Sequence, residues 1–229
     1  MALILSIESS TTACSVAIHE KGGLLGIMEL HQDNVHGQKL LLLVKDLMER
    51  IGLKSSDLQA VAVSSGPGSY TGLRIGVSIA KGLAFAHHIP LIGVDTLAAL
   101  AYQVRPFIQD NDLIIPMMDA RRMEVYMAVY DAMFKEIEPV QPRVIESNPF
   151  LDYLKERRVF YIGDGVNKMK EVLSHPNSVF LEKLNSSLTV GELAYKKFEQ
   201  KLFEDIAYFE PNYLKEFRVI ASKKNPFLV

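Results

Sequence analysis

The chain has 229 residues, a formal net charge of -2 and 48% hydrophobic residues, which is typical of a globular protein with a substantial buried core. The near-neutral charge gives no overall basic field for binding nucleic acid, and the single cysteine, Cys14, excludes an internal disulfide and disfavours a cysteine-based zinc site. The N-terminus lacks the pattern of a signal peptide and no segment is long and apolar enough to span a membrane. We therefore expect a cytoplasmic protein.

The first half of the chain alternates strand-like and helix-like segments. Three short β-type runs, Leu3–Glu8, Ala13–His19 and Gly23–Leu30, predict a three-stranded meander. The segments that follow predict a helix over Gln38–Ile51, a strand over Gln59–Ser65, a helix from the Gly66-Pro67-Gly68-Ser69 turn to Ala86, a strand over Pro90–Val94, and a helix from a cap at Asp95 or Thr96 to about Arg105.

The second half repeats this order of elements. It predicts strands over Leu113–Asp119, Met123–Tyr130 and about Lys135–Ile145, a helix capped by Asn148 that ends at Arg157, a strand over Val159–Ile162, a helix after Gly163-Asp164-Gly165 that ends near Leu173, a strand over Val179–Leu181, and a helix capped by Thr189 that ends at Leu202. Phe203–Val229 contains two prolines and a cluster of basic residues, which predicts a tail over the surface.

Both halves therefore spell βββαβαβα, which is the plan of the actin/hexokinase/Hsp70-like ATPase fold. We expect two facing α/β domains, residues 1–105 and 106–229. In this fold the hairpin between the first two strands of each domain points into the cleft. These hairpins and the adjacent turns nominate the following residues as facing the cleft or a nucleotide: Glu8, Ser9, Ser10, Thr11, Gly66, Gly68, Asp119, Arg121, Arg122 and Gly163.

A ridge of small residues runs along the second predicted helix, formed by Gly72, Gly76, Ala80 and Ala84. Residues four apart share a helical face, and glycine costs a helix about 0.5–1 kcal/mol relative to alanine, so the ridge indicates close approach of another element. We interpret it as a docking surface for a second helix. The first predicted helix carries five successive apolar residues, Leu40 to Val44, which is more than one sheet-facing stripe needs.

The chain resembles the bacterial TsaB (YeaZ) family over nearly its whole length. The resemblance is carried by ILSIESSTTACSVAI, SSGPGSYTGLRIGVSIAKGLA, GVDTLAALA, PMMDARRMEVYMAVYD and Pro211-Asn212-Tyr213-Leu214. It implies a part in making threonylcarbamoyladenosine beside the anticodon of tRNAs that read codons beginning with A. It also implies that the chain is a non-catalytic partner of the transferase TsaD, joined by the ATPase TsaE, and that tRNA is reached through this complex.

In the TsaB family the first two helices of the first domain form the joint with TsaD, which implies an interface on this chain. The same apolar face predicts a homodimer when the partner is missing. The expected interface residues are Leu40, Leu41, Val44, Leu47, Met48, Gly72, Arg74, Gly76, Val77, Ala80, Leu83 and Ala84.

The cleft-facing hairpins predict no catalysis by this chain alone. The first hairpin has an acid and hydroxyl groups but no glycine to let the backbone approach a phosphate, and no dinucleotide or P-loop signature is present. Arg121 and Arg122 can grip a phosphate or pair with Asp119, Glu124 or Glu8, and pairing is the favoured interpretation. His31 and His36, five residues apart, cannot share an ion on one helix, so we expect no metal and no cofactor. The alternative functions are a small-molecule kinase or ATPase of this fold and, less favoured, a peptidase.

Overall fold

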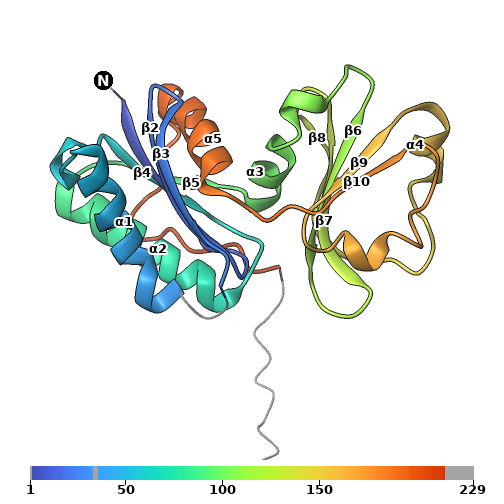
Figure 1. The fold of residues 1–229 in the computed structure, drawn as a ribbon, viewed down its shortest axis with the longest axis horizontal. Coiled ribbons are helices and arrows are strands. Elements are labelled where there is room, and N and C mark those ends of the chain that lie inside the picture. The colour runs from blue at the N-terminus through green and yellow to red at the C-terminus, as the bar shows by residue number, and fades with distance from the viewer. Residues whose placement is uncertain (1, 33–35, 215–229) are drawn as a thin grey trace, which may run out of the picture.

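Two five-stranded mixed sheets lie side by side, with helices between them and outside them (Figure 1). The computed structural model describes residues 2–32 and 36–214. The first sheet has the order β3-β2-β1-β4-β5 and the second the order β10-β9-β6-β7-β8. The strands of the first sheet are β1 Leu3–Glu8, β2 Cys14–Glu20, β3 Gly23–Leu30, β4 Ala60–Ser64 and β5 Leu91–Val94. The strands of the second sheet are β6 Leu113–Asp119, β7 Glu124–Asp131, β8 Glu136–Val144, β9 Val159–Ile162 and β10 Ser178–Leu181.

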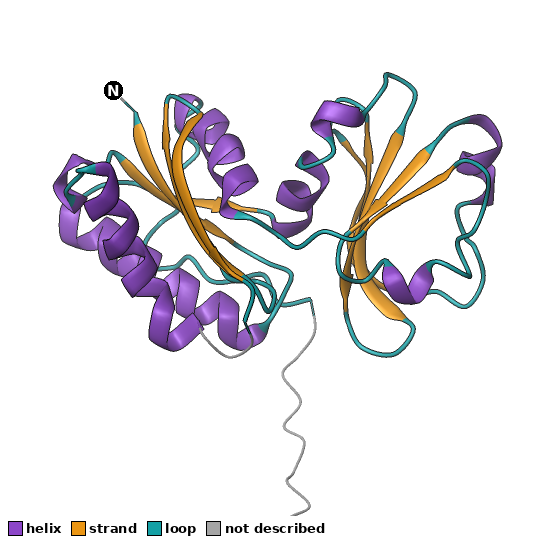
Figure 2. Ribbon diagram, in the orientation of Figure 1, coloured by secondary structure: helices purple, strands orange, loops and turns teal. Residues whose placement is uncertain are grey.

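The two sheets share one topology, so the duplicated order predicted from the sequence is confirmed. In each, the first strand pairs antiparallel with the second and parallel with the fourth, as β1 does with β2 and β4, and β6 does with β7 and β9. Figure 2 shows the same arrangement of strands in both halves. The helices are α1 His36–Ile51, α2 Tyr70–His87, α3 Thr96–Tyr102, α4 Leu151–Glu156 and α5 Ser187–Glu199, with single 3₁₀ turns at Ser55–Asp57, Arg105–Phe107 and Asn167–Met169.

Several predicted helix boundaries are wrong. The helix expected after Gly163 is only the 3₁₀ turn Asn167–Met169, because the backbone N–H of Gly165 bonds back to the carbonyl of Met117 at 3.0 Å. The final helix is capped by Ser186 instead of Thr189, through a bond from the N–H of Leu188. Helix α4 begins only at Leu151, with Phe150 as its N-cap. Asp95 caps α3 as predicted, although α3 ends at Tyr102.

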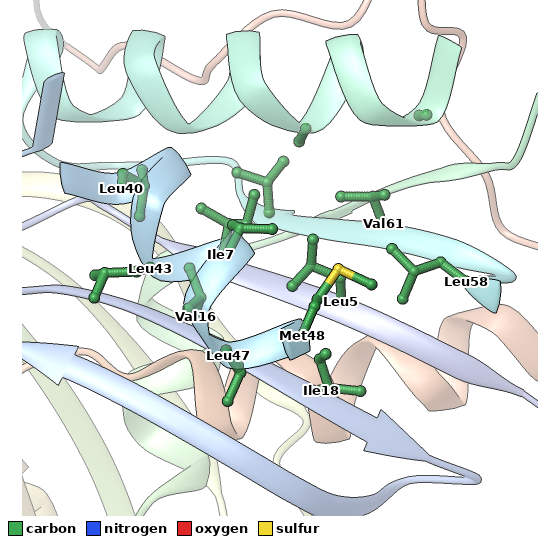
Figure 3. Packing of buried hydrophobic residues seen from close by; sticks show 14 of the residues in the cluster. Leu5, Ile7, Val16, Ile18, Leu40, Leu43, Leu47, Met48, Leu58 and Val61 are labelled. Carbon is green, nitrogen blue, oxygen red and sulfur yellow. The ribbon is translucent and has the colours of Figure 1, made fainter. Parts of the chain in front are cut away.

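Helices α1 and α2 cover one face of the first sheet. Figure 3 shows the α1 side chains of Leu40, Leu43 and Leu47 packed toward the strand residues Ile7 and Val16, all of them buried. Leu41 and Leu42 of the same apolar run are 55% and 56% exposed. The run therefore divides into a sheet-facing part, which makes the core, and an outward-facing part.

The other face of each sheet is covered by a helix from the opposite half of the sequence. Helix α5 packs on the first sheet, where Val190 and Ala194 join a cluster with Ile4 and Ile92. Helix α3 packs on the second sheet through Leu97, Leu100 and Ala101, beside Ile114, Met118 and Phe160. Both helices lie between the two sheets (Figure 1). A division of the chain after residue 105 thus places α3 with the first sheet, although it covers the second, and places α5 with the second sheet, although it covers the first. The predicted domain limits stay a prediction.

Residues 203–214, which we call the C-terminal strap, return from α5 to the first sheet. The N–H of Glu204 bonds to the carbonyl of Leu91 at 2.9 Å on the edge strand β5, and the N–H of Asn212 bonds to the carbonyl of Ser65 at 2.7 Å. The predicted surface tail is confirmed for this part, whereas the basic cluster, Lys215, Arg218, Lys223 and Lys224, lies outside the described residues. Within the described ranges, no helix has the length and apolar character needed to cross a membrane.

Candidate functional site

The turn after β1 holds the first group of predicted cleft residues, and all of them are buried. Glu8 is 0% exposed, and its Oε1 accepts hydrogen bonds from the N–H of Ser10 at 2.6 Å and from the hydroxyl of Ser64 at 3.1 Å. Burial raises the pKa of Glu8 above its ordinary value, and the hydrogen bonds offset part of that increase. Ser9, Ser10 and Thr11 are also buried. The four predicted cleft residues of the first hairpin are therefore shielded from solvent, whereas Thr12 of the same turn is exposed.

The element that covers this turn is the start of α2. The N–H of Ser69, the N-cap of α2, bonds to the carbonyl of Ser10 at 2.7 Å. A Cβ placed on Gly68 lies 2.6 Å from both Cβ and the carbonyl oxygen of Ser10. A Cβ on Gly72 collides with the carbonyl oxygen of Ser9, and one on Gly76 collides with its hydroxyl. Only hydrogen at these positions lets the helix lie this close to the hairpin.

The interpretation of the small-residue ridge as a docking surface is therefore wrong, because the ridge packs inside the chain. Of the predicted interface residues, nine are buried and offer no surface to a partner: Leu40, Val44, Leu47, Met48, Gly72, Gly76, Val77, Ala80 and Ala84. Leu41 and Arg74 are exposed and Leu83 is half-buried, so their place in an interface stays a prediction.

An exposed apolar face does exist on the outer side of α1 and α2. Leu41 and Leu42 project from α1, and Phe85 of α2 is 71% exposed. Three residues before Phe85 on α2 lies Gly82, which is exposed and has no atom within 4 Å of the position of a Cβ. A glycine inside a helix, with nothing of its own chain near it, gives up about 1 kcal/mol of helix stability without any gain in internal packing. We call these four residues the outer α1/α2 face.

The second hairpin turn holds Asp119, Arg121 and Arg122. Asp119 accepts hydrogen bonds from the Nζ of Lys168 and from the N–H of Arg121. Partial burial alone would raise the pKa of Asp119, but these bonds outweigh it, so the pKa is lowered. The expected pairing of Asp119 with an arginine side chain is thus replaced by a pairing with Lys168. Arg121 and Arg122 are exposed and have φ values of 72° and 50°, a left-handed conformation that costs about 1–2 kcal/mol per residue.

The other two of the three glycines predicted to face the cleft serve close backbone contacts. Gly66, at φ 112°, lies against the carbonyl of Asn212 in the strap, and Gly163, at φ 133°, lies against the carbonyl of Met117. Both glycines therefore permit close packing within the chain.

The burial of Glu8 gives a testable consequence. Because the pKa of Glu8 is raised in the folded chain, its ionisation opposes folding, so this group destabilises the fold increasingly as pH rises above its ordinary pKa near 4.5. We expect Glu8→Gln to gain stability relative to the wild type between pH 5 and pH 8. Urea titrations at four pH values measure the difference, and a constant difference across them would show that the pKa of Glu8 is not shifted.

Three structural features were not predicted from the sequence. His19 in β2 is fully buried beneath Gly191 of α5, and burial lowers the pKa of this imidazole to about 4. Asp95 at the start of α3 has its pKa raised to about 6 by burial. Tyr213 of the strap packs on Tyr70 of α2, with ring centroids 4.8 Å apart. Gly191, in the middle of the final helix, was the one sequence signal for the contact between His19 and α5.

No group of three or more histidine, cysteine, aspartate or glutamate side chains in the described part of the chain is arranged to hold a metal ion. The side chain of His36, one of the two histidines considered from the sequence, lies outside the described residues. Cys14 is buried in β2, and burial raises the pKa of its thiol. A raised pKa keeps the thiol protonated and unreactive.

Two duplicated sheets with a β3-β2-β1-β4-β5 order define a protein of the actin/hexokinase/Hsp70-like class. A component A of (R)-2-hydroxyglutaryl-CoA dehydratase from Acidaminococcus fermentans shares this fold, with a TM-score of 0.52 at 11% identity over 86% of this chain and 99% of that one. Relatives named TsaB match most of this chain at 28% and 31% identity, so the chain belongs to the TsaB family, also called YeaZ. A family model described as tRNA N6-adenosine threonylcarbamoyltransferase, TsaD, matches residues 6–222.

The relatives named TsaB match over far more of their length than the relatives named as transferases. The TsaB of Haemophilus influenzae is 28% identical over 93% of each chain, and that of Bacillus subtilis is 31% identical over 74% of each chain. A threonylcarbamoyltransferase from Geobacillus thermodenitrificans matches only 42% of this chain and 28% of its own length. The solved YeaZ of Pseudomonas aeruginosa superposes with a TM-score of 0.78 at 27% identity, over 93% of this chain and all of that one.

Proposed function

We propose that this chain is a non-catalytic subunit of the assembly that makes threonylcarbamoyladenosine in tRNA. Its task in this proposal is to bind a TsaD-like transferase through the outer α1/α2 face. The observation that supports the proposal most is that the exposed apolar side chains of Leu41, Leu42 and Phe85 occur together with the uncovered Gly82 on the layer formed by α1 and α2. Apolar patches of this kind on a soluble protein are typical of protein–protein contact.

The geometry of α2 supports a helical partner. Phe85 and Gly82 lie about one turn apart on the exposed side of α2, and Leu42 lies on the adjacent α1. A glycine with open space beside it permits the backbone of a second helix to approach closely, while leucine and phenylalanine provide the apolar area to be buried. Burial of one such side chain contributes about 1.5–3 kcal/mol to binding, before the cost of association.

The first hairpin supports an accessory role over catalysis. In ATPases of this fold the corresponding turn approaches a phosphate, whereas here the carbonyl of Ser10 is occupied by the N–H of Ser69, and Gly68 packs on the same residue. The alternative of a self-sufficient kinase or ATPase predicts ATP turnover by the purified chain, which an NADH-coupled assay measures directly. The peptidase alternative loses its thiol nucleophile, because Cys14 is buried with a raised pKa.

The finer parts of the proposal concern the other members of the assembly. TsaE joins the complex of this chain with TsaD, tRNA is reached through the complex, and the location is the cytoplasm. When the transferase is missing, two copies of the chain pair through the same outer α1/α2 face, because burial of Leu41, Leu42 and Phe85 lowers the free energy of either complex.

The substitution Leu42→Asp tests the proposal. Placing a carboxylate within an apolar contact leaves a charge desolvated without a partner, so we expect binding to the TsaD of the same organism to weaken at least about 100-fold. Isothermal titration calorimetry measures the affinity, and threonylcarbamoylation of tRNA by the reconstituted proteins should fall with it. Sedimentation velocity should show the variant as a monomer at concentrations where the wild type dimerises.

Leu151→Asp is the matched control. Leu151 is 49% exposed on α4, which packs against the second sheet. The same change there should leave both the affinity for TsaD and the modification of tRNA unaltered. If Leu42→Asp binds the transferase within threefold of the wild type, the outer α1/α2 face is not the docking surface.

A further inference from the structure

The side chain of Arg74 is held in one orientation by residues far apart in the sequence. Its guanidinium carbon lies 4.1 Å from the ring centre of Tyr70 and 5.9 Å from that of Tyr213. Its Nε donates a hydrogen bond to the hydroxyl of Tyr213 at 3.2 Å. An arginine stacked on one ring and bonded to another loses little side-chain entropy when it binds a further group, because it is already ordered.

The strap that brings Tyr213 to Arg74 is itself fixed to the first sheet. Lys81 of α2 donates a hydrogen bond from its Nζ to the carbonyl of Phe209 at 2.8 Å, and the N–H of Asn212 bonds to Ser65. Tyr213 follows Asn212 directly, so its ring is placed by these bonds and by its contact with Tyr70. The clamp around Arg74 is therefore a product of the tertiary fold.

The positive charge of Arg74 is not neutralised within the described chain. Residues 2–32 and 36–214 place no carboxylate oxygen within 4.0 Å of its guanidinium, whereas Arg105, Arg143 and Arg158 each have such a partner. Glu210 of the strap acts on Arg74 only at longer range. Guanidinium carries five N–H donors, and the bond to Tyr213 uses the one on Nε. The in-plane donors of Nη1 and Nη2 match the two oxygens of a carboxylate.

We propose that Arg74 binds an aspartate or glutamate side chain of the protein that docks on the outer α1/α2 face. The proposal rests on the proposed function for the existence of that docking. Arg74 and Phe85 are separated by about three helical turns, which places them on the same side of α2. The charge of Arg74 thus lies at one end of the apolar contact, where a charged pair fixes the register of two helices.

The surroundings favour a protein carboxylate over an RNA phosphate. The exposed side of α1 mixes the cations Lys45 and Arg50 with the anions Asp46 and Glu49, and the whole chain has a net charge of -2. A phosphate backbone requires a run of positive charge, which these described residues of α1 do not form.

The test uses the full-length chain and the TsaD of the same organism. We expect Arg74→Lys, which keeps the charge but loses the planar fork, to weaken binding about tenfold, and Arg74→Ala at least as much. Tyr213→Phe, which removes only the hydroxyl that orients Nε, should weaken binding about threefold. The affinity of the wild type should fall with salt more steeply than that of Arg74→Ala. Lys135→Ala removes an exposed cation from the turn between β7 and β8, and this change should leave binding unaltered.

Two outcomes would overturn the inference. If Leu42→Asp abolishes binding while both Arg74 variants bind within twofold of the wild type, the docking face stands and the role of Arg74 is refuted. If Arg74→Ala leaves transferase binding intact but reduces the binding of tRNA by the isolated chain, the ligand is a phosphate. Should Leu42→Asp also leave binding intact, the proposed function itself fails. Thermal melts of each variant confirm that it is folded.

Discussion

The same substitution at two glycines of α2 should change stability in opposite directions. We expect Gly72→Ala to lower the free energy of unfolding by about 2–3 kcal/mol, because its methyl group meets the carbonyl oxygen of Ser9, a backbone atom that cannot move aside. We expect Gly82→Ala to raise the free energy of unfolding by about 0.5–1 kcal/mol, because its methyl group enters open space and alanine favours the helix. Urea unfolding followed by circular dichroism measures both.

The pair is informative because each variant controls for the other. Both substitutions add one methyl group to the same helix and have the same effect on its intrinsic propensity. A loss of stability in Gly82→Ala would mean that the outer side of α2 is packed in the free chain. An unchanged stability in Gly72→Ala would mean that the hairpin after β1 does not lie against the helix.

A second large effect is expected from His19 at mildly acid pH. The pKa of its imidazole is about 4 in the folded chain and about 6.5 when unfolded, because its ring is buried between β2 and α5, and only the backbone of Leu188 opposes this shift. As pH falls, the unfolded chain takes up the proton first. The contribution of His19 to stability is therefore full above about pH 6.5 and is lost progressively toward pH 4, with a total of roughly 3 kcal/mol.

His19→Gln removes this titration, so its stability should fall less steeply with pH than that of the wild type between pH 6.5 and pH 4.5. Chemical unfolding at half-unit steps of pH gives the two slopes. Parallel slopes for His19→Gln and the wild type would contradict the burial of an uncharged imidazole.

Local patterns predicted most of the fold. Short apolar runs located the ten strands of the described residues, and the repeated order of elements indicated the duplication before any contact was known. The caps were less certain, since Ser186 and Thr189 both stand near the start of α5 and only the geometry of the preceding loop selects Ser186. The turn after β9 failed as a helix because a tertiary bond from Gly165 to Met117 competes with helical bonding.

The docking face could not be predicted correctly from the same patterns. A ridge of glycines indicates that another element approaches a helix closely. The same small residues are required whether that element is a helix of a partner or a hairpin of the same chain, so the sequence does not distinguish the two. Gly72 and Ser9 are brought together only by the pairing of β1 with β4. Gly82 breaks the spacing of four that made the ridge conspicuous, and its exposure is visible only once the sheet-facing side of α2 is known.

The packing of α3 and α5 on the sheets of the opposite halves of the sequence could not be predicted either, because the sequence of neither helix indicates which sheet it covers. The polar contacts below α5 join residues from opposite ends of the chain, such as Ser6 Oγ, which donates to the carbonyl of Ser187 at 2.9 Å, and the N–H of Ser187, which donates to Ser15 Oγ at 2.8 Å.

This long-range closure has a consequence for biosynthesis. The strands of the first sheet are translated well before the helix that shields their second face, because β5 ends at Val94 and α5 begins at Ser187. Until α5 emerges, Ile4, Ala62 and Ile92 remain open to water and to other nascent chains. We therefore expect translation products that stop before α5 to aggregate through this uncovered surface.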